Sequence, residues 1–342
     1  MSNDILNYKL MDLTFLQDNF IKSEADKFVA INLGNCYIKG LVVEGDKVTD
    51  YFIEKKEDLS ATIKKLWTEK KIPFKNIKVS VKNPACLVRY FSFPKMDKKR
   101  LNQALFYEMS KLIPFTPEDV YFDYSILEDI SAREVAILLA VAKKDFVDNI
   151  LESFGNVGLR VAEINLDSVC LSNLFLNNCK DANDENSCLL DIGYNFSTMT
   201  IIHRGIPFIT RDVKFSVKDV FQIIARIKNK SLDDIEKEVF NLKNKGNLLK
   251  LNQDSILSFC KELKSSFDYF EVNKSEPINK VYLSGGLASA KGIDEIFVEA
   301  LDTEVETLKP FLEDDQRLDQ VFFSKEFNAI KNNFSVLFGL IL

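Results

Sequence analysis

Residues 28–33 form a short apolar run that ends at Gly34, and Lys39 follows five residues after that glycine. Backbone N–H groups at such a turn, together with a lysine ammonium group, can bind the oxygens of a phosphate. An acid beside the turn would hold the metal ion that accompanies the phosphate, but the residue at that place is Asn32. The segment therefore predicts half of a phosphate-binding site in which an amide replaces the acid.

A second segment repeats the pattern of the first. Residues 190–202, LDIGYNFSTMTII, align without a gap with residues 31–43, INLGNCYIKGLVV. Asp191 stands where the first segment has Asn32, and each segment continues through a glycine turn into a second apolar strand. Such a repeat indicates a duplicated fold, although two unrelated β-hairpins would give the same pattern. Two such loops facing one another would surround a cleft with amide N–H groups and one carboxylate.

The elements that must position these loops follow from the spacing of apolar residues. In the first half we predict strands at residues 28–33, 38–43, 48–53 and 77–81, and a helix that carries Leu59, Ile63, Leu66 and Trp67 on one face. In the second half we predict strands at residues 187–191, 198–203, 208–213 and 280–283, with helices in residues 216–250, 256–270 and 293–301. Between them we predict strands at residues 87–93 and 135–142, a helix from Asp97 that Pro114 ends, and a helix at residues 146–154.

Composition limits the classes of function. The chain has 342 residues, 46% of them hydrophobic, which is enough for a sizeable core in one or two domains. Its net charge of −6 argues against broad nucleic-acid binding, which needs a basic surface. The apolar runs at residues 135–142 and 335–342 are far shorter than a membrane span, and no secretory signal is visible. We therefore expect a cytoplasmic protein without a membrane span.

Cysteine spacing invites a metal interpretation that other features disfavour. Cys170, Cys179 and Cys188 are evenly spaced, but the chain has no CxxC pair, and His203 is its single histidine. A zinc site usually needs closer ligand pairs. His203 precedes Arg204-Gly205, which is typical of a hairpin turn, so a catalytic Cys–His pair is also disfavoured. We expect buried, reduced thiols.

The glycine turns resemble the phosphate loops of the actin-like ATPase superfamily, which includes actin, chaperone ATPases, sugar kinases and FtsA. The first loop resembles Asn32-x-Gly34 with Lys39 behind it, and aspartate is the family's residue where this chain has Asn32. The segment with Asp191 and Gly193, followed by Ser197 and Thr198, resembles the second phosphate loop. The segment Ser284-Gly285-Gly286 resembles the adenosine loop.

Longer motifs, in this order, resemble the PilM family of type IV pilus assembly proteins, which is related to FtsA and GspL. They are YEMSKLIPF at residues 107–115, the segment at residues 134–168, ELKSSFDYF at residues 262–270 and NFSVLFGLIL at residues 333–342. The resemblance covers residues 26–342. It implies an α/β, actin-like fold of two ribonuclease H-like domains, with a small α+β lobe inserted in the first.

The resemblance also implies domain boundaries. Residues 1–25 would be a lead-in, and residues 26–84 with 159–185 would form the first domain, with the C-terminal helix at residues 328–342 packing back on it. The inserted lobe would cover residues 85–158, and the second domain residues 186–327.

By resemblance, ATP or ADP with Mg²⁺ would bind in the cleft between the domains. The residues at matching positions are Asn32, Gly34, Asn35, Lys39, Asp191, Gly193, Ser197, Thr198, Ser284, Gly285 and Gly286. Because Asn32 carries no charge, the metal would depend mainly on Asp191. Tyr194 and Phe196 are also bulkier than the family's small residues. We therefore expect a binding module with at most weak ATPase activity and name no catalytic residue beyond a metal or water role for Asp191.

The partner implied by the resemblance is the short N-terminal cytoplasmic tail of a PilN-like inner-membrane protein. It would lie in a groove beside the inserted lobe, near Ile113, Pro114 and Phe115, although helix termination and core packing explain these three residues equally well. The protein would then act at the cytoplasmic face of the inner membrane. Homo-oligomerisation, and a type II secretion machine in place of a pilus, stay open.

Two other functions are compatible with the same fold. A sugar-type kinase would need an aspartate base between the phosphate loops. The candidates there, each with a surface or capping explanation, are Asp123, Asp145, Asp148 and Asp167. An FtsA-like filament former would need a C-terminal amphipathic helix, but residues 335–342 are apolar all round and have no basic flank, which is typical of core.

Overall fold

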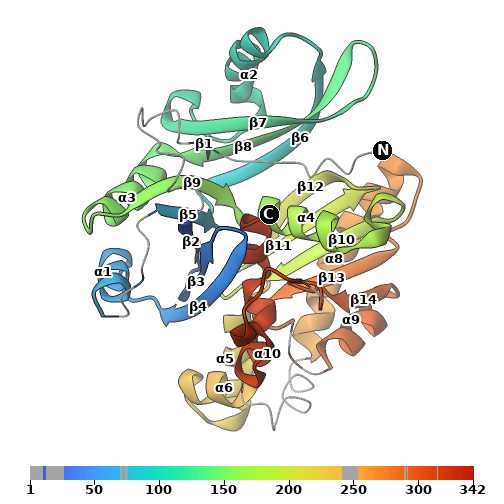
Figure 1. Cartoon of the computed structure of the whole chain (residues 1–342). Coiled ribbons are helices and arrows are strands. Elements are labelled where there is room, and N and C mark those ends of the chain that lie inside the picture. The colour runs from blue at the N-terminus through green and yellow to red at the C-terminus, as the bar shows by residue number, and fades with distance from the viewer. Residues whose placement is uncertain are drawn as a thin grey trace. The chain divides into compact units, whose positions relative to one another are not determined.

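The computed structural model describes residues 11–12, 27–69, 72, 76–240, 253–288, 290, 292–313 and 315–342. The chain divides into two compact units, Met1–Asn173 and Leu174–Leu340, which are described separately (Figure 1). The boundary between the units falls inside helix α4 (Asp167–Asn178). The finer domain boundaries expected from the sequence, with residues 328–342 on the first domain, stay a prediction.

The first unit is built on a six-stranded sheet in the order β1-β9-β5-β2-β3-β4. Its strands are β1 (Met11–Asp12), β2 (Lys27–Leu33), β3 (Tyr37–Glu44), β4 (Lys47–Lys55), β5 (Asn76–Val81) and β9 (Arg160–Leu166). Strands β2, β3 and β4 form an antiparallel meander, and β5 and β9 extend the sheet parallel to β2. The two-residue strand β1 lies in the expected lead-in and pairs with β9; the rest of residues 1–25 lies outside the described residues.

Helices α1 (Leu59–Glu69) and α3 (Lys144–Gly155) contribute to the core of this sheet. Ile63 of α1 and Phe154 of α3 belong to the same buried cluster as Val29, Ile31 and Leu33 of β2. Successive side chains of a strand point to opposite faces. Asn32 therefore points to the other face of the sheet, away from this cluster.

A smaller lobe lies between β5 and α3. It consists of β6 (Cys86–Pro94), α2 (Lys98–Leu112), the 3₁₀ turn η3 (Pro117–Asp119), β7 (Val120–Asp129) and β8 (Glu134–Lys143). The sheet order is β6-β8-β7 with antiparallel pairs. Asp97 caps α2 by accepting a hydrogen bond from the Arg100 N–H at 3.0 Å, and α2 ends at Leu112, just before Pro114, as predicted. Strand β7 was not predicted.

The second unit repeats the topology of the first. Its sheet has the order β12-β11-β10-β13-β14. The strands are β10 (Asn186–Ile192), β11 (Ser197–His203), β12 (Ile206–Val213), β13 (Lys280–Gly285) and β14 (Glu304–Thr307). Strands β10, β11 and β12 form an antiparallel meander, and β13 and β14 follow parallel to β10. This arrangement matches β4-β3-β2-β5-β9, so the predicted duplication is confirmed.

Helices pack against the second sheet to form one continuous core. They include α5 (Val217–Lys228), α6 (Leu232–Phe240), α8 (Gln253–Lys274) and α9 (Ile293–Leu301). Part of the helix predicted in residues 216–250 lies outside the described residues. The 3₁₀ turn η4 (Lys180–Asn183) precedes β10, and the chain ends in η6 (Gln320–Phe323), α10 (Lys325–Ile330), η7 (Lys331–Phe334) and α11 (Ser335–Leu340). All of α11 is buried, as expected for core.

Gly40 provides a test of how the first meander packs. It lies opposite Phe52 in the β3–β4 pair, and a Cβ atom added at Gly40 would lie 2.1 Å from Cζ of the buried Phe52 ring. We expect Gly40→Ala to lower the free energy of unfolding by about 1–3 kcal/mol, because the ring must shift in a packed core. Urea unfolding followed by circular dichroism measures this change.

The control is Gly155→Ala at the exposed end of α3, where an added Cβ meets no atom within 4 Å. There the substitution should be neutral or stabilise by about 0.5–1 kcal/mol. An equal loss of stability in both variants would contradict the packing argument.

Candidate functional site

The turn between β2 and β3, which the sequence predicts as a phosphate-binding loop, is tight at Gly34. A Cβ atom at Gly34 would lie 2.6 Å from the carbonyl oxygen of Tyr37, so only glycine allows this close turn. Lys39 is the cross-strand partner of Asn32, and such partners lie on the same face of a sheet. The structure therefore brings the predicted Gly34, Asn35 and Lys39 together with Asn32 at one end of β2.

Asn32 forms the centre of a buried polar cluster. Its side-chain amide nitrogen donates to Oγ of Ser80 at 2.9 Å and to both carboxylate oxygens of Asp167 at 3.0 Å each. Asn32, Ser80 and Asp167 are 2%, 0% and 6% exposed. Parallel pairing of β2 with β5 sets Asn32 beside Ser80. Asp167 begins α4 directly after β9, the next strand in the sheet.

Asp167 corrects an expectation from the sequence. Its burial rules out the surface explanation that was open for this residue. Its position at the carboxyl end of a parallel strand could have identified Asp167 as a site residue, because functional side chains often lie at the β-α turns of α/β sheets. The amide–carboxylate contact itself joins residues 135 positions apart, which no local pattern reveals.

Asp191 of the second unit lies at the equivalent place, at the end of β10. It is 7% exposed and pairs with Thr198 on one side and with Ser284 on the other. Gly193 follows β10 directly, and its carbonyl oxygen accepts a hydrogen bond from the N–H of Val217, the first residue of α5. The acid that the first unit lacks is thus present here.

The two hydroxyl residues predicted beside Asp191 have protein partners. Oγ of Ser197 donates to the carbonyl oxygen of Phe215 at 2.6 Å, and the serine is fully buried. Oγ1 of Thr198 donates to a carboxylate oxygen of Asp212 at 2.9 Å. Asp212, which sequence reasoning missed, therefore adds a second carboxylate to this face, two strands from Asp191.

The Ser284-Gly285-Gly286 segment brings backbone close to Asp191. Gly285 has a φ of +86°, and an added Cβ would lie 2.4 Å from the carbonyl oxygen of Ile192 and 2.8 Å from Oδ1 of Asp191. The Gly286 N–H donates to that same carbonyl oxygen at 3.0 Å. Oγ of Ser284 is buried without a hydrogen-bond partner among the described residues. A buried hydroxyl of this kind fits a ligand or water at the turn.

A magnesium ion would find one carboxylate at this turn, that of Asp191. The described residues include no group of three histidine, cysteine or acidic side chains that could hold a metal. Mg²⁺ that accompanies phosphates usually keeps several waters and takes only one or two protein carboxylates. Asp191 is therefore compatible with an ion brought by a nucleotide.

His203 and the buried cysteines take no part in this arrangement. Nδ1 of His203 lies 2.7 Å from Oδ1 of Asn186, and the turn at Arg204-Gly205 has φ values of 48° and 82°, which confirms the predicted hairpin turn. Cys170, Cys188 and Cys260 are buried, and burial raises the pKa of each thiol, that of Cys260 to about 12. These thiols are protonated at neutral pH, as expected of core residues.

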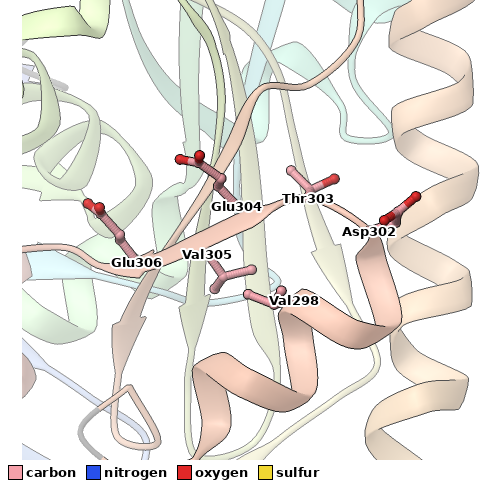
Figure 2. Close-up of a pocket in the computed structure, with 6 residues that line it drawn as sticks. All are labelled: Val298, Asp302, Thr303, Glu304, Val305 and Glu306. Carbon is pink, nitrogen blue, oxygen red and sulfur yellow. The ribbon is translucent and has the colours of Figure 1, made fainter.

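A shallow pocket of about 490 Å³ lies at the other end of the second sheet. Figure 2 shows it between α9 and β14, with the carboxylates of Glu304 and Glu306 pointing away from Val298 and Val305. Glu304 is paired with Lys280, at the start of β13, whereas Gly285 ends that strand. The pocket is therefore separate from the glycine turn and from Asp191.

Comparison with solved structures agrees with the duplicated topology. The chain is similar to a chain of a PilM–PilN type IV pilus biogenesis complex, with 21% identity, a TM-score of 0.79, and coverage of 92% of this chain and 97% of that one. It is also similar to the ethanolamine utilization protein EutJ from Carboxydothermus hydrogenoformans, with 12% identity, a TM-score of 0.56 and coverage of 92% and 88%. With its two ribonuclease H-like sheets, the chain has the actin-like ATPase fold.

The family follows from a second comparison. The family model described as type IV pilus assembly protein PilM matches residues 29–342. The chain therefore belongs to the PilM family and is a component of type IV pilus assembly. Among the described helices, none has the length and apolar character needed to cross a bilayer.

The buried amide–carboxylate contact can be measured by a double-mutant cycle. Removing the Asn32 amide leaves the Asp167 carboxylate buried without these donors, and hydrogen bonds to charged groups contribute about 1.5–3 kcal/mol. We expect Asn32→Ala and Asp167→Ala each to destabilise the protein, with a coupling energy of that size in the double variant. Denaturant unfolding of the four proteins checks this. Additive effects would show that the two side chains do not interact.

Proposed function

We propose that this PilM-family protein binds ATP or ADP at its glycine turns and that it recruits the N-terminal cytoplasmic peptide of a PilN-like inner-membrane protein. Its role would be that of a nucleotide-responsive scaffold with weak or no hydrolysis. The observation that carries the nucleotide part is the repeated glycine turn at the end of β2 and of β10, each with a polar residue facing its meander partner.

Five of the predicted residues have a direct chemical role in this proposal. The N–H groups after Gly34 and Gly193 would donate to phosphate oxygens, and Lys39 would meet them as a point charge. Asp191 would hold the water shell of Mg²⁺. The Ser284 hydroxyl, which has no described protein partner, would donate to the nucleotide at the glycine turn.

Weak turnover follows from the chemistry of Asn32. Phosphoryl transfer to water depends on charge stabilisation and on a group that orients the attacking water. Asn32 brings no negative charge, and its amide nitrogen is directed at Asp167 and Ser80. A nucleotide would then change the relative stability of conformations rather than be consumed.

Asp167 also supports the kinase alternative. It is an aspartate between the two phosphate loops in sequence, and it lies in a buried polar cluster, where a base could act. ATP-dependent phosphorylation of a sugar panel, followed by mass spectrometry, tests this alternative. Phosphorylation that Asp167→Asn abolishes would favour the kinase over the scaffold.

Isothermal titration calorimetry with ATP and ADP tests the nucleotide site. We expect Lys39→Met to weaken binding by about tenfold, which corresponds to about 1.4 kcal/mol, because the side chain keeps its length but loses its charge. The matched control is Lys47→Met at the exposed first residue of β4, which removes the same charge from the same unit. Failure of the wild-type protein to bind either nucleotide would contradict this part of the proposal.

The partner proposal is supported by the similarity to a PilM chain whose solved structure is a complex with PilN. In this chain Ile113 is buried and Phe115 is half-buried, with Nζ of Lys143 4.9 Å from the centroid of the Phe115 ring. Pro114 is exposed between them. Pro114 and the exposed edge of Phe115 are therefore the part of this segment that a peptide could contact.

Fluorescence anisotropy with a labelled N-terminal peptide of the PilN-like partner tests this surface. Phe115→Ala should weaken peptide binding by about tenfold or more, as expected for an aromatic anchor in an interface. Val272→Ala, at a side chain of the second unit that is 83% exposed, is the control for loss of apolar surface. Equal affinities of the two variants would place the peptide elsewhere.

A further inference from the structure

We propose that this chain binds its nucleotide without needing a divalent cation. The Asn32 amide donates hydrogen bonds to the Asp167 carboxylate, whereas an aspartate at position 32 would form with Asp167 a pair of acids that could bind a metal ion. This inference rests on the nucleotide binding proposed above and concerns which groups of the same site compensate the negative charge of the phosphates.

The first unit does not fit a metal ion. Mg²⁺ requires oxygen ligands at about 2.0–2.1 Å in near-octahedral geometry. The atom that approaches both oxygens of Asp167 is the amide nitrogen of Asn32, a hydrogen-bond donor that repels a cation. Both residues are more than nine-tenths buried, so an ion would have to displace a packed amide to reach this carboxylate.

The amide also removes the electrostatic need for a cation. The Asn32 amide nitrogen lies 3.0 Å from the Asp167 oxygens. Two carboxylates at that distance could not both stay ionised without a proton or a metal ion between them. With asparagine, the second group donates to the first and the pair carries one negative charge. The cluster is therefore complete in the absence of a metal.

Other groups of the chain can compensate the negative charge of the phosphates. Lys39 faces the same side of the sheet as Asn32, and the turn at Gly34 supplies backbone N–H groups. In the second unit Asp191 is the carboxylate at the glycine turn, and Asp212, two strands away, accepts a hydrogen bond from Thr198, so these acids add little to the binding of an ion that the phosphates already hold. A cation that arrives with ATP should thus change the affinity only slightly.

The wild-type protein gives the first test. Calorimetric titrations of ADP and ATP in EDTA and in excess Mg²⁺ should give dissociation constants within about threefold of each other, less than about 0.7 kcal/mol. Weakening by about tenfold or more in EDTA would overturn the inference and leave the proposed nucleotide binding intact. Absence of binding in both buffers would instead contradict that proposed function.

The variant Asn32→Asp tests the residue itself and needs no nucleotide. We expect a melting temperature at least ~3 °C below that of the wild type in EDTA, because two buried carboxylates then repel each other, and recovery when Mg²⁺ or Ca²⁺ is added. The wild-type melting temperature should not respond to either ion. The matched control is Asn102→Asp, the same change at an exposed position of α2.

Three outcomes of these scans would overturn the role given to Asn32. They are equal melting temperatures for the Asn32→Asp and Asn102→Asp proteins in EDTA, no recovery of Asn32→Asp with either ion, and a wild-type protein that the ions stabilise as much as the variant. If Asn32→Asp does not fold, the wild-type titrations and thermal scans still show whether the protein needs a divalent cation. If it folds and binds nucleotide, its affinity should fall by about tenfold or more when Mg²⁺ is removed.

Discussion

The buried carboxyl group of Asp167 constrains how the first unit can be built. A carboxylate that is 6% exposed is costly unless hydrogen-bond donors surround it. Asn32 provides a donor only because the parallel register of β2, β5 and β9 brings the ends of these strands to one edge. The sheet order and the polar cluster therefore depend on each other: a one-residue slip of β2 would turn Asn32 to the opposite face, toward the apolar core.

The two units share one strand topology but differ in the polar and charged residues at the ends of their strands. In the first, an amide is directed at a carboxylate that comes from the start of a helix. In the second, Asp191 stands at the end of the equivalent strand, and Gly285 packs so closely that an added Cβ would lie 2.8 Å from Oδ1 of Asp191. Duplication preserved the strands and the glycine turns, whereas the residues that set the charge diverged.

The sequence predicted the parts of the fold that local patterns determine. Both meanders were found from alternating apolar residues and glycine turns, and Asp97 was recognised as a cap. Strand β7 was missed because most of its residues are only partly buried, so no clear alternation marks it. Asp212 was missed, and Asp167 was named only as one of four candidate bases, because their importance comes from hydrogen bonds with Thr198 and Asn32 that only the sheet register brings about.

The difference between a binding module and an ATPase can rest on one side-chain atom. Replacing a carboxylate oxygen by an amide nitrogen at Asn32 leaves the shape of the turn unchanged but reverses the hydrogen-bonding role of that atom from acceptor to donor. A donor satisfies the buried Asp167 and keeps it in place, whereas an acceptor would require a cation and would make the site responsive to one. Scaffolding needs a nucleotide to be held, and hydrolysis needs charge to be stabilised as it develops on the phosphate. In the proposed nucleotide site, the contact between Asn32 and Asp167 would serve the first requirement and work against the second.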